Sequence, residues 1–203
     1  MEPRPDEQEL LERARAGDLD AFNVLVEHYQ TTVFNLCLRM LRTPQSAEDA
    51  TQETFISAYR NLGSFRGGSF RSWLYRIAGN ASYDELRRQK ARPTVRLDQP
   101  GEDGEAQIDP PSSEASLDER AQQSEVRRVL QNALGRLPDD QRLAIILCDV
   151  QGLDYAEIAV VMKCSLGTVK SRINRARGKL RILLLAEGGE LLPDRFRQSG
   201  EDK

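Results

Sequence analysis

The chain has 203 residues, of which 39% are hydrophobic and 30% are charged, values that fit a soluble globular protein of one or two domains. Its first twelve residues are acidic and polar, without the apolar core of a secretion signal. No apolar run approaches the roughly 20 residues that span a bilayer. We therefore expect a cytoplasmic protein that does not insert into membranes.

Cysteine and histidine are too sparse for redox, metal or triad chemistry. Cys37, Cys148 and Cys164 are odd in number and lack CxxC spacing, which argues against a disulfide framework and against a zinc site. His28 is the only histidine, so no histidine-based site can be assembled. We predict no cofactor, no metal and no catalytic residue, and an enzyme is the least favoured class.

The formal net charge of -3 conceals a strong segregation of charge along the chain. Residues 1–59 hold 5 basic and 11 acidic residues, and residues 60–92 hold 8 basic and 2 acidic residues. Residues 97–119 hold 8 acidic and no basic residues, whereas residues 163–181 hold 7 basic and no acidic residues. Two basic islands in an acidic chain indicate a nucleic-acid binder that also contacts another kind of partner.

Apolar residues recur at helical spacing, and strand signals are almost absent. In the first half this spacing predicts four helices, at residues 6–16, 20–42, 47–62 and 72–90. Thr43-Pro44 separates the second helix from the third, which we expect to begin at the capping box Ser46-Ala47-Glu48-Asp49.

The helical pattern collapses at about residue 92 and returns at about residue 117. The intervening stretch of Pro, Gly, Ser, Asp and Glu cannot bury enough apolar surface to fold. We therefore expect an all-α protein made of two small helical domains that are joined by a flexible acidic linker. The predicted divisions are a first domain at 6–92, the linker at 93–116, a second domain at 117–186 and a tail at 187–203.

A helix-turn-helix is predicted within residues 154–180. A short helix over residues 155–162 is followed by a tight turn at Lys163-Cys164, and Ser165 is placed to cap a second helix that runs to about residue 185. At 100° per residue, one stripe of this second helix is apolar and is expected to be buried: Val169, Ile173, Ala176 and Leu180.

The other faces of the same helix carry polar and basic side chains and no acid. Ser171, Asn174 and Arg175 lie opposite the apolar stripe, and the flanks carry Lys170, Arg177, Thr168, Arg172 and Lys179. Arginine can bond guanine edges, asparagine can bond adenine, and flanking cations neutralise phosphates. This helix is therefore predicted to enter a DNA major groove, with a merely solvated basic face as the alternative.

The loop at 65–71 and the helix that follows it form the second basic island. The loop combines glycines with Phe65, Phe70 and two arginines, which suits stacking on unpaired or flipped bases. One outward stripe of the helix is formed by Arg76, Asn80, Tyr83 and Arg87. The alternative interpretation makes Phe65, Phe70 and Trp73 anchors of the core.

The helix predicted at 47–62 offers a different surface. Thr51, Phe55, Ala58, Tyr59 and Leu62 are expected to face inward. Asp49, Glu53 and Ile56 then lie outside, with Gln52 at the boundary. An acidic face with an exposed isoleucine suits a protein partner better than DNA.

Two segments resemble the extracytoplasmic-function (ECF) family of RNA polymerase sigma factors. SAEDATQETFISAYRNLGSF (residues 46–65), which continues into FRGGSFRSWLYRIAGNASYDELRRQKAR, resembles the second conserved region of that family. Residues 137–180, from LPDDQRLAIILCDVQGLDYAEIA to GTVKSRINRARGKL, resemble its fourth region. The matches occur in the order in which the family has them.

The resemblance implies a role for each candidate site. The face around Asp49, Gln52, Glu53 and Ile56 is expected to bind the clamp helices of the polymerase β′ subunit, with a further contact to β. A promoter −10 element is expected to contact Phe65, Arg66, Ser69, Phe70, Arg76, Asn80, Tyr83, Asp84 and Arg87. A −35 element is expected to contact Thr168, Lys170, Ser171, Arg172, Asn174 and Arg175. The resemblance also implies an anti-sigma factor as a regulator, and it places the acidic linker in the polymerase cleft and RNA exit channel.

Two other functions stay open at this point. A helix-turn-helix repressor or activator acting without polymerase would need a dimerisation segment, and no heptad seam is visible. An RNA-binding adaptor would use the aromatic loop alone. No GxxxxGK[ST] motif supports melting of DNA by nucleotide hydrolysis.

Overall fold

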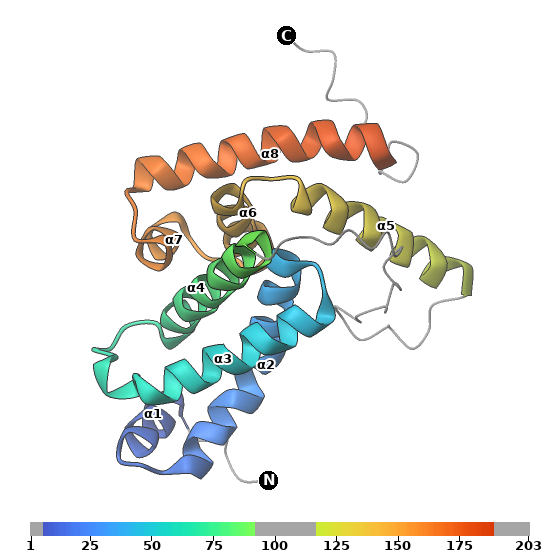
Figure 1. The fold of residues 1–203 in the computed structure, drawn as a ribbon. Coiled ribbons are helices and arrows are strands. Elements are labelled where there is room, and N and C mark those ends of the chain that lie inside the picture. The colour runs from blue at the N-terminus through green and yellow to red at the C-terminus, as the bar shows by residue number, and fades with distance from the viewer. Residues whose placement is uncertain (1–5, 92–116, 189–203) are drawn as a thin grey trace.

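The computed structural model describes residues 6–91 and 117–188, which form two groups of helices packed against each other (Figure 1). The first group contains α1 (Glu7–Arg15), α2 (Leu19–Leu41), α3 (Pro44–Arg60), the short η1 (Leu62–Ser64) and α4 (Phe70–Ala91). The second contains α5 (Leu117–Gly135), α6 (Asp139–Ile145), η2 (Ile146–Val150), α7 (Tyr155–Met162) and α8 (Leu166–Gly188). No strand occurs in these two ranges, so the all-α prediction is confirmed.

Side-chain caps and turns explain where several helices begin and end. Asp18 Oδ1 accepts from the backbone N–H groups of the first turn of α2, at 3.0 and 3.1 Å. Asp154 and Glu157 form a reciprocal capping box at the start of α7. Lys163 ends α7 in the left-handed conformation, with φ 49°. The predicted turn of the helix-turn-helix is therefore present.

The start of α3 corrects a prediction. The helix begins at Pro44, with Thr43 as its N-cap, and not at the Ser46 capping box. Proline is favoured at the first helical position because the N–H that it lacks would have no partner there. Ser46 lies inside the helix, and its hydroxyl accepts from Gln89 Nε2 of α4 at 3.1 Å.

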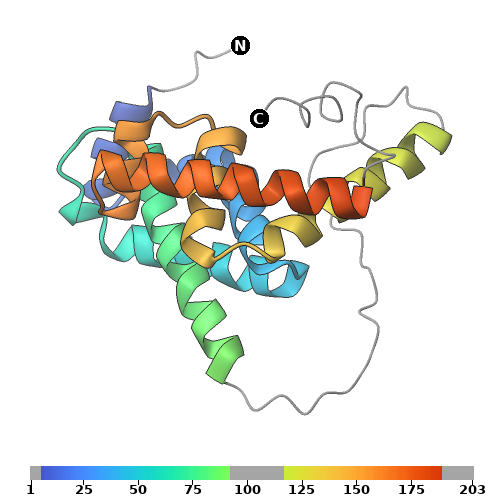
Figure 2. The ribbon, with the colours of Figure 1, turned by 90° about the horizontal axis from the view of Figure 1, so that it is seen from above.

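The larger of two buried clusters extends through both helical groups. α4 lies between α2 and α3 on one side and α7 on the other (Figures 1 and 2). One buried cluster joins Leu36 of α2 and Leu74 of α4 to Ile146 of η2 and Ile158 of α7. A second, smaller cluster holds α5, α6 and α8 together. The linker predicted at 93–116 and most of the predicted tail lie outside the described residues.

Candidate nucleic-acid and partner interfaces

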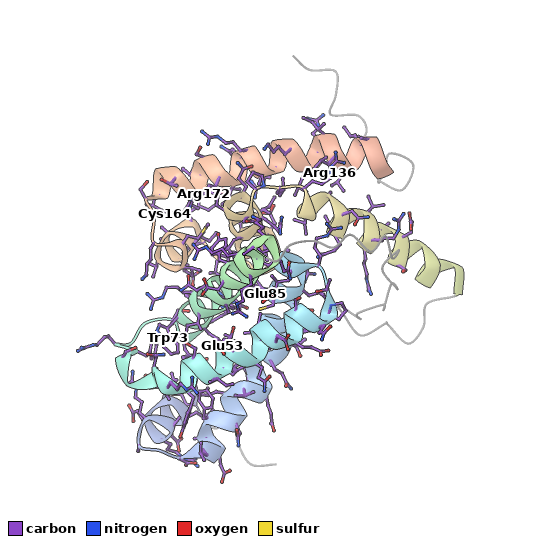
Figure 3. The ribbon with its side chains drawn as sticks, viewed as in Figure 1. Glu53, Trp73, Glu85, Arg136, Cys164 and Arg172 are labelled. Carbon is purple, nitrogen blue, oxygen red and sulfur yellow. The ribbon has the colours of Figure 1, made fainter. Side chains whose placement is uncertain are left out.

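The outer face of α3 presents the four residues predicted to meet a protein partner. Asp49, Gln52, Glu53 and Ile56 are all exposed, and Ile56 has a relative exposure of 38%. Figure 3 shows Glu53 on this helix. The exposed isoleucine among carboxylates makes the surface both acidic and apolar, as a partner with basic and apolar side chains requires.

The buried side of α3 differs from the prediction at two positions, Thr54 and Tyr59. Thr54 is fully buried. Its hydroxyl donates to the carbonyl of Ala50 at 2.6 Å, so burial leaves the hydroxyl with a hydrogen-bond partner. Tyr59, which was expected to face inward, is exposed at the edge of the helix and packs on Phe22, with ring centroids 5.0 Å apart. The tyrosine can thus cover apolar surface while its hydroxyl meets water.

Aromatic side chains at the junction of the loop and α4 pack on one another. Phe65 and Phe70 are buried and Trp73 is half-buried, and the three ring centroids lie 5.4 to 5.7 Å apart. The guanidinium of Arg15 lies over the Phe65 ring, 5.3 Å from its centroid. These contacts support the core-anchor alternative for the rings. Base contacts by Phe65 and Phe70 stay a prediction.

The tip of the same loop is exposed. Arg66 and Ser69 flank Gly67 and Gly68, which adopt φ values of 96° and 87° that favour glycine. Ser69 also accepts from the backbone N–H of Ser72 at 3.1 Å, so it caps α4 at Phe70. The helix therefore begins two residues before the predicted start, and the cationic tip is held close to its first turn.

The α4 residues expected to contact a −10 element divide into two sets. Asp84 and Arg87 are exposed and form an ion pair with a 3.1 Å separation. Arg76, Asn80 and Tyr83 line a cavity of about 250 Å³ together with side chains of the second helical group, among them Met162, Lys163 and Arg172. Burial, followed by the nearby Asp140 carboxylate, raises the pKa of Tyr83 to about 12, so its hydroxyl stays protonated.

The helix-turn-helix has the predicted buried stripe and cap. Val169, Ile173, Ala176 and Leu180 are buried, and Ser165 Oγ accepts from the backbone N–H of Thr168 at 3.2 Å. The prediction for this helix is confirmed on both counts. The face opposite this stripe, with Asn174 and Arg175, is exposed.

The side chains predicted to read a −35 element have unequal freedom. Lys170, Asn174 and Arg175 are exposed, and Ser171 is half-buried. Thr168 shares a 2.9 Å hydrogen bond with Ser165. Arg172 is half-buried, at the end of α8 next to the turn (Figure 3), and its Nε donates to Asp140 Oδ2 at 2.8 Å.

Two acidic residues that position arginines of α8 were not anticipated. Asp140 of α6 holds Arg172, and Asp149 of η2 binds Arg177 at 2.5 Å. The hydrogen bond from Arg177 lowers the pKa of Asp149, and the same bond raises the pKa of Arg177. The partners lie 32 and 28 positions apart in the sequence, beyond the range of any helical pattern. The only local signal is the Asp139-Asp140 pair at the start of α6.

Metal binding and membrane insertion find no support in the described ranges. No group of three or more His, Cys, Asp or Glu side chains within 6–91 and 117–188 could hold a metal ion. The three cysteines are free thiols. Among the same residues, no helix is long and apolar enough to cross a membrane.

Comparison with known proteins identifies the two helical groups. Residues 25–92 match sigma-70 region 2, and residues 127–180 match sigma-70 region 4. The RNA polymerase sigma-H factor of Pseudomonas aeruginosa is 41% identical over 180 residues, covering 87% of this chain and 93% of that protein. The ECF RNA polymerase sigma-E factor of Escherichia coli K12 is 40% identical over 185 residues, covering 87% and 93%.

Solved structures agree with these relatives. CnrH in complex with the cytosolic domain of CnrY aligns with a TM-score of 0.66 and 27% identity, covering 90% of this chain and 99% of that one. The sigma factor RpoE of Bartonella quintana, in complex with the anti-sigma factor NepR, aligns with a TM-score of 0.61 and 27% identity, covering 80% and 96%. The chain therefore belongs to the ECF group of RNA polymerase sigma factors, within the sigma-70 family.

Proposed function

We propose that this sigma factor binds core RNA polymerase and directs initiation at promoters that carry −10 and −35 elements. In this proposal the clamp helices of β′ bind the face of α3, where Glu53 and Ile56 are exposed side by side with Asp49 and Gln52. A second contact is made with the β subunit. The acidic carboxylates suit a basic partner, and Ile56 supplies the apolar contact.

Promoter reading is proposed to occur on two separate faces. The loop tip with Arg66 and Ser69, together with Arg76, Asn80 and Tyr83 of α4, engages the −10 element. The exposed Lys170, Asn174 and Arg175 of α8 engage the −35 element in its major groove. The observation that carries this proposal is the presence of two acid-poor cationic faces and one acidic-apolar face on three different helices.

Melting is proposed to be driven by binding and not by an enzymatic step of the chain itself. Capture of an unstacked base on a protein surface is worth on the order of 1–3 kcal/mol. A few such bases at the −10 element offset the local loss of pairing while polymerase holds the two faces apart. The factor accordingly acts in the cytoplasm, where polymerase and promoter DNA are found.

In vitro transcription with the purified chain tests the proposal. The full chain is mixed with core polymerase, core binding is measured by pull-down, and transcript starts are mapped on genomic DNA fragments. We expect core binding and starts at one recurring pair of elements. Failure to bind core while duplex DNA is still bound would favour the repressor or activator. Binding of RNA with no promoter-specific start would favour the RNA adaptor.

Regulation by an anti-sigma factor is proposed as well. The similar sigma factor RpoE of Bartonella quintana was solved with its anti-sigma factor NepR, and the likeness covers 80% of this chain. We expect the anti-sigma factor of this chain to copurify with it and to abolish core binding when added back. Copurified partners that leave core binding intact would contradict this part of the proposal.

A further inference from the structure

The short helix α1 packs against the loop that is proposed to engage the −10 element. α1 buries Leu10, Leu11 and Ala14 in the same cluster that holds Phe65, the residue at which this loop starts. The helix lies before residues 25–92, the part of the chain that matches sigma-70 region 2. The match therefore assigns no role to the contacts between α1 and the loop.

Arg15, the last residue of α1, binds the start of the loop in two ways. Its Nη2 donates to the carbonyl of Phe65, and its guanidinium carbon lies 5.3 Å from the centroid of the Phe65 ring. A charged donor makes a stronger hydrogen bond than a neutral one, and a cation over an aromatic face adds a further attraction. Arg15 therefore holds both the backbone and the side chain of the residue at which the loop starts.

The position of Arg15 is itself fixed, because α1 is held at both of its ends. In the first turn of α1, Glu7 accepts a hydrogen bond from the hydroxyl of Tyr29 in α2. At the other end, Gly17 turns the chain directly into α2 with a φ of 96°, a value that favours glycine. The helix thus presents Arg15 to the loop as a donor in a defined place.

The far end of the loop has an anchor of its own. Ser69 Oγ accepts from the backbone N–H of Ser72 at 3.1 Å, which ties the end of the loop to the first turn of α4. Between the two anchors lies the exposed tip, residues 66–68. Because the tip is so short, its conformation depends on where both of its ends are held. One anchor is local, whereas the other comes from Arg15, 50 positions away in the sequence.

We propose that Arg15 is a positioning residue for recognition of the −10 element. By holding the start of the loop, it fixes the place at which Arg66 and Ser69 meet the unpaired strand. This inference rests on the proposed function and adds to the same site a residue that does not itself touch the DNA. A loop that is already ordered loses less conformational entropy when it binds, so the contact between Arg15 and Phe65 raises the affinity for the strand.

Substitutions at Arg15 separate its donor groups from its apolar stem. Arg15→Met keeps an unbranched side chain that can still cover Phe65, but it removes the charge and every N–H donor. Arg15→Lys keeps a cation and a donor. The matched control is Arg13→Met, which removes an exposed cation of the same helix that pairs with Asp18 at 2.8 Å. Both methionine variants change the net charge equally, so a difference between them does not come from charge alone.

Tryptophan fluorescence measures how firmly the start of the loop is held. Trp73 is the single tryptophan of the chain, and its ring centroid lies 5.4 Å from that of Phe65. Quenching by acrylamide is measured on the free full-length chain, and because acrylamide is neutral, the lost charge does not change its approach. We expect a larger quenching constant for Arg15→Met, a value near that of the parent chain for Arg15→Lys, and no change for Arg13→Met.

Binding of a single strand by the holoenzyme tests whether the held loop matters for promoter recognition. The probe is a short fluorescent oligonucleotide with the −10 sequence found at the mapped transcript starts, titrated with core polymerase that is saturated with the parent or a variant chain. We expect Arg15→Met to bind this strand about tenfold more weakly, since it loses a charge-assisted hydrogen bond and a cation–π contact. Arg15→Lys is expected to restore most of the affinity. The affinities for core polymerase and for a −35 duplex are expected to stay unchanged in all three variants.

Salt dependence distinguishes positioning from a direct contact with DNA. If Arg15 bound a phosphate, Arg15→Met would lower the slope of log affinity against log salt concentration by about one, and Arg13→Met would not. Positioning predicts the same slope for both variants. A lower slope in Arg15→Met alone would therefore overturn the proposal.

Three further results would overturn it. These are equal quenching of Trp73 in Arg15→Met and the parent chain, stronger quenching without weaker strand binding, and an equal loss of strand affinity in Arg13→Met. A parent chain that neither binds core polymerase nor starts at a promoter would contradict the proposed function instead. The quenching measurement would still decide whether Arg15 holds the loop, since it needs neither polymerase nor DNA.

Discussion

Arg172 and Arg175 lie three positions apart on α8 in different surroundings. Arg172 is held by Asp140 and lies close to Cys164, with 3.5 Å between Nη1 and Sγ. Arg175 is exposed. A side chain that is already ordered loses less conformational entropy when it binds. Arg172 thus offers a fixed cation beside the cavity next to α4, whereas Arg175 must be ordered by the DNA edge that it contacts.

Two substitutions separate the proposed activities at the scale of single residues. Arg175→Ala is expected to weaken binding of a −35 duplex by about 1–3 kcal/mol without changing the affinity for core polymerase. Glu53→Lys is expected to weaken core binding, because it reverses a charge on the partner face, without changing the affinity for the duplex. Titrations of core polymerase and of a fluorescent −35 duplex measure the two effects.

Matched controls place the same changes elsewhere on exposed helical surface. Glu9→Lys reverses a charge on α1, and Arg128→Ala removes a cation from α5 that pairs with Glu125. Neither control is expected to alter core or duplex affinity. An equal loss of both activities in Arg175→Ala or Glu53→Lys would indicate misfolding and contradict the assignment of that residue to one face.

At the scale of elements, local periodicity predicted the positions of α1 to α4, α7 and α8, because the core selects one apolar stripe per helix. It indicated helical structure from about residue 117 but did not divide that stretch into α5, α6 and η2. The errors lie at the helix starts. Ser46 and Ser69 show why: a hydroxyl near a helix start can cap it, as Ser69 does, or bind another helix, as Ser46 does. Sequence alone does not distinguish these two outcomes. The buried Thr54 was missed for a similar reason, because its partner is a carbonyl of its own helix.

The ion pair between η2 and α8 makes the stability of the second group depend on pH. Arg177 lowers the pKa of Asp149 from its ordinary value of 3.8, so the unfolded state binds a proton more readily than the folded state. The pair therefore stabilises the fold above the ordinary value, and this contribution is lost as the pH falls through the lowered folded-state pKa. Asp149→Asn is expected to lower the melting temperature at pH 7, and this effect is expected to shrink progressively as the pH falls below 3.8.

Thermal unfolding of the variant and parent chains at several pH values measures this dependence. Glu125→Gln is the matched control, because Arg128 likewise lowers the pKa of Glu125, but that pair lies within α5 alone. We expect Glu125→Gln to lower the melting temperature less, since the pair that it removes does not connect α5 to another element. A melting temperature of Asp149→Asn that stays below that of the parent chain by the same amount at every pH would contradict the argument.

At the scale of the molecule, the sequence indicated two helical groups but not their contact. Hydrogen bonds between the two groups join residues far apart in the sequence: Gln151 binds Tyr75, 76 positions away, and Thr32, 119 positions away. Periodicity within one helix carries no information about such pairs. Helical periodicity also placed Tyr83 on an outward stripe. The pattern of apolar residues shows which face of a helix is polar, but it does not show whether that face meets solvent, DNA or a distant part of the same chain.

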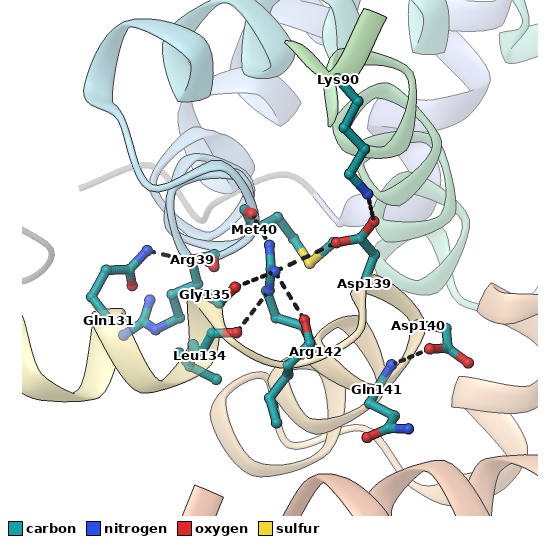
Figure 4. A network of polar contacts seen from close by, with 11 residues as sticks. Arg39, Met40, Lys90, Gln131, Leu134, Gly135, Asp139, Asp140, Gln141 and Arg142 are labelled. Atoms are coloured by element: carbon teal, nitrogen blue, oxygen red, sulfur yellow. Dashed lines mark hydrogen bonds and ion pairs between the residues drawn. The ribbon is translucent and has the colours of Figure 1, made fainter. Parts of the chain in front are cut away.

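Arg142 connects the two helical groups through a buried guanidinium (Figure 4). Its side chain is 5% exposed and donates to four carbonyls, two at the end of α5, one in the turn that follows and one at the end of α2. Burial lowers its pKa, and Asp139 at 3.4 Å opposes that shift. Arg142→Leu takes the guanidinium donor away from all four carbonyls, and among the described residues only that of Leu134 keeps a backbone donor, the N–H of Leu137 at 3.1 Å. We therefore expect the free energy of unfolding to fall by about 3–5 kcal/mol.

Urea unfolding followed by circular dichroism tests this expectation on the full chain. Because the core is continuous across the two groups, the parent chain is expected to unfold in one transition. Arg142→Leu removes the donor to Met40 and destabilises the end of α5, so the second group is expected to unfold first, in a separate transition. Arg128→Leu, which removes a surface cation from the same group, should cost less than about 1 kcal/mol. A loss of similar size in both variants would show that the buried guanidinium does not hold the groups together.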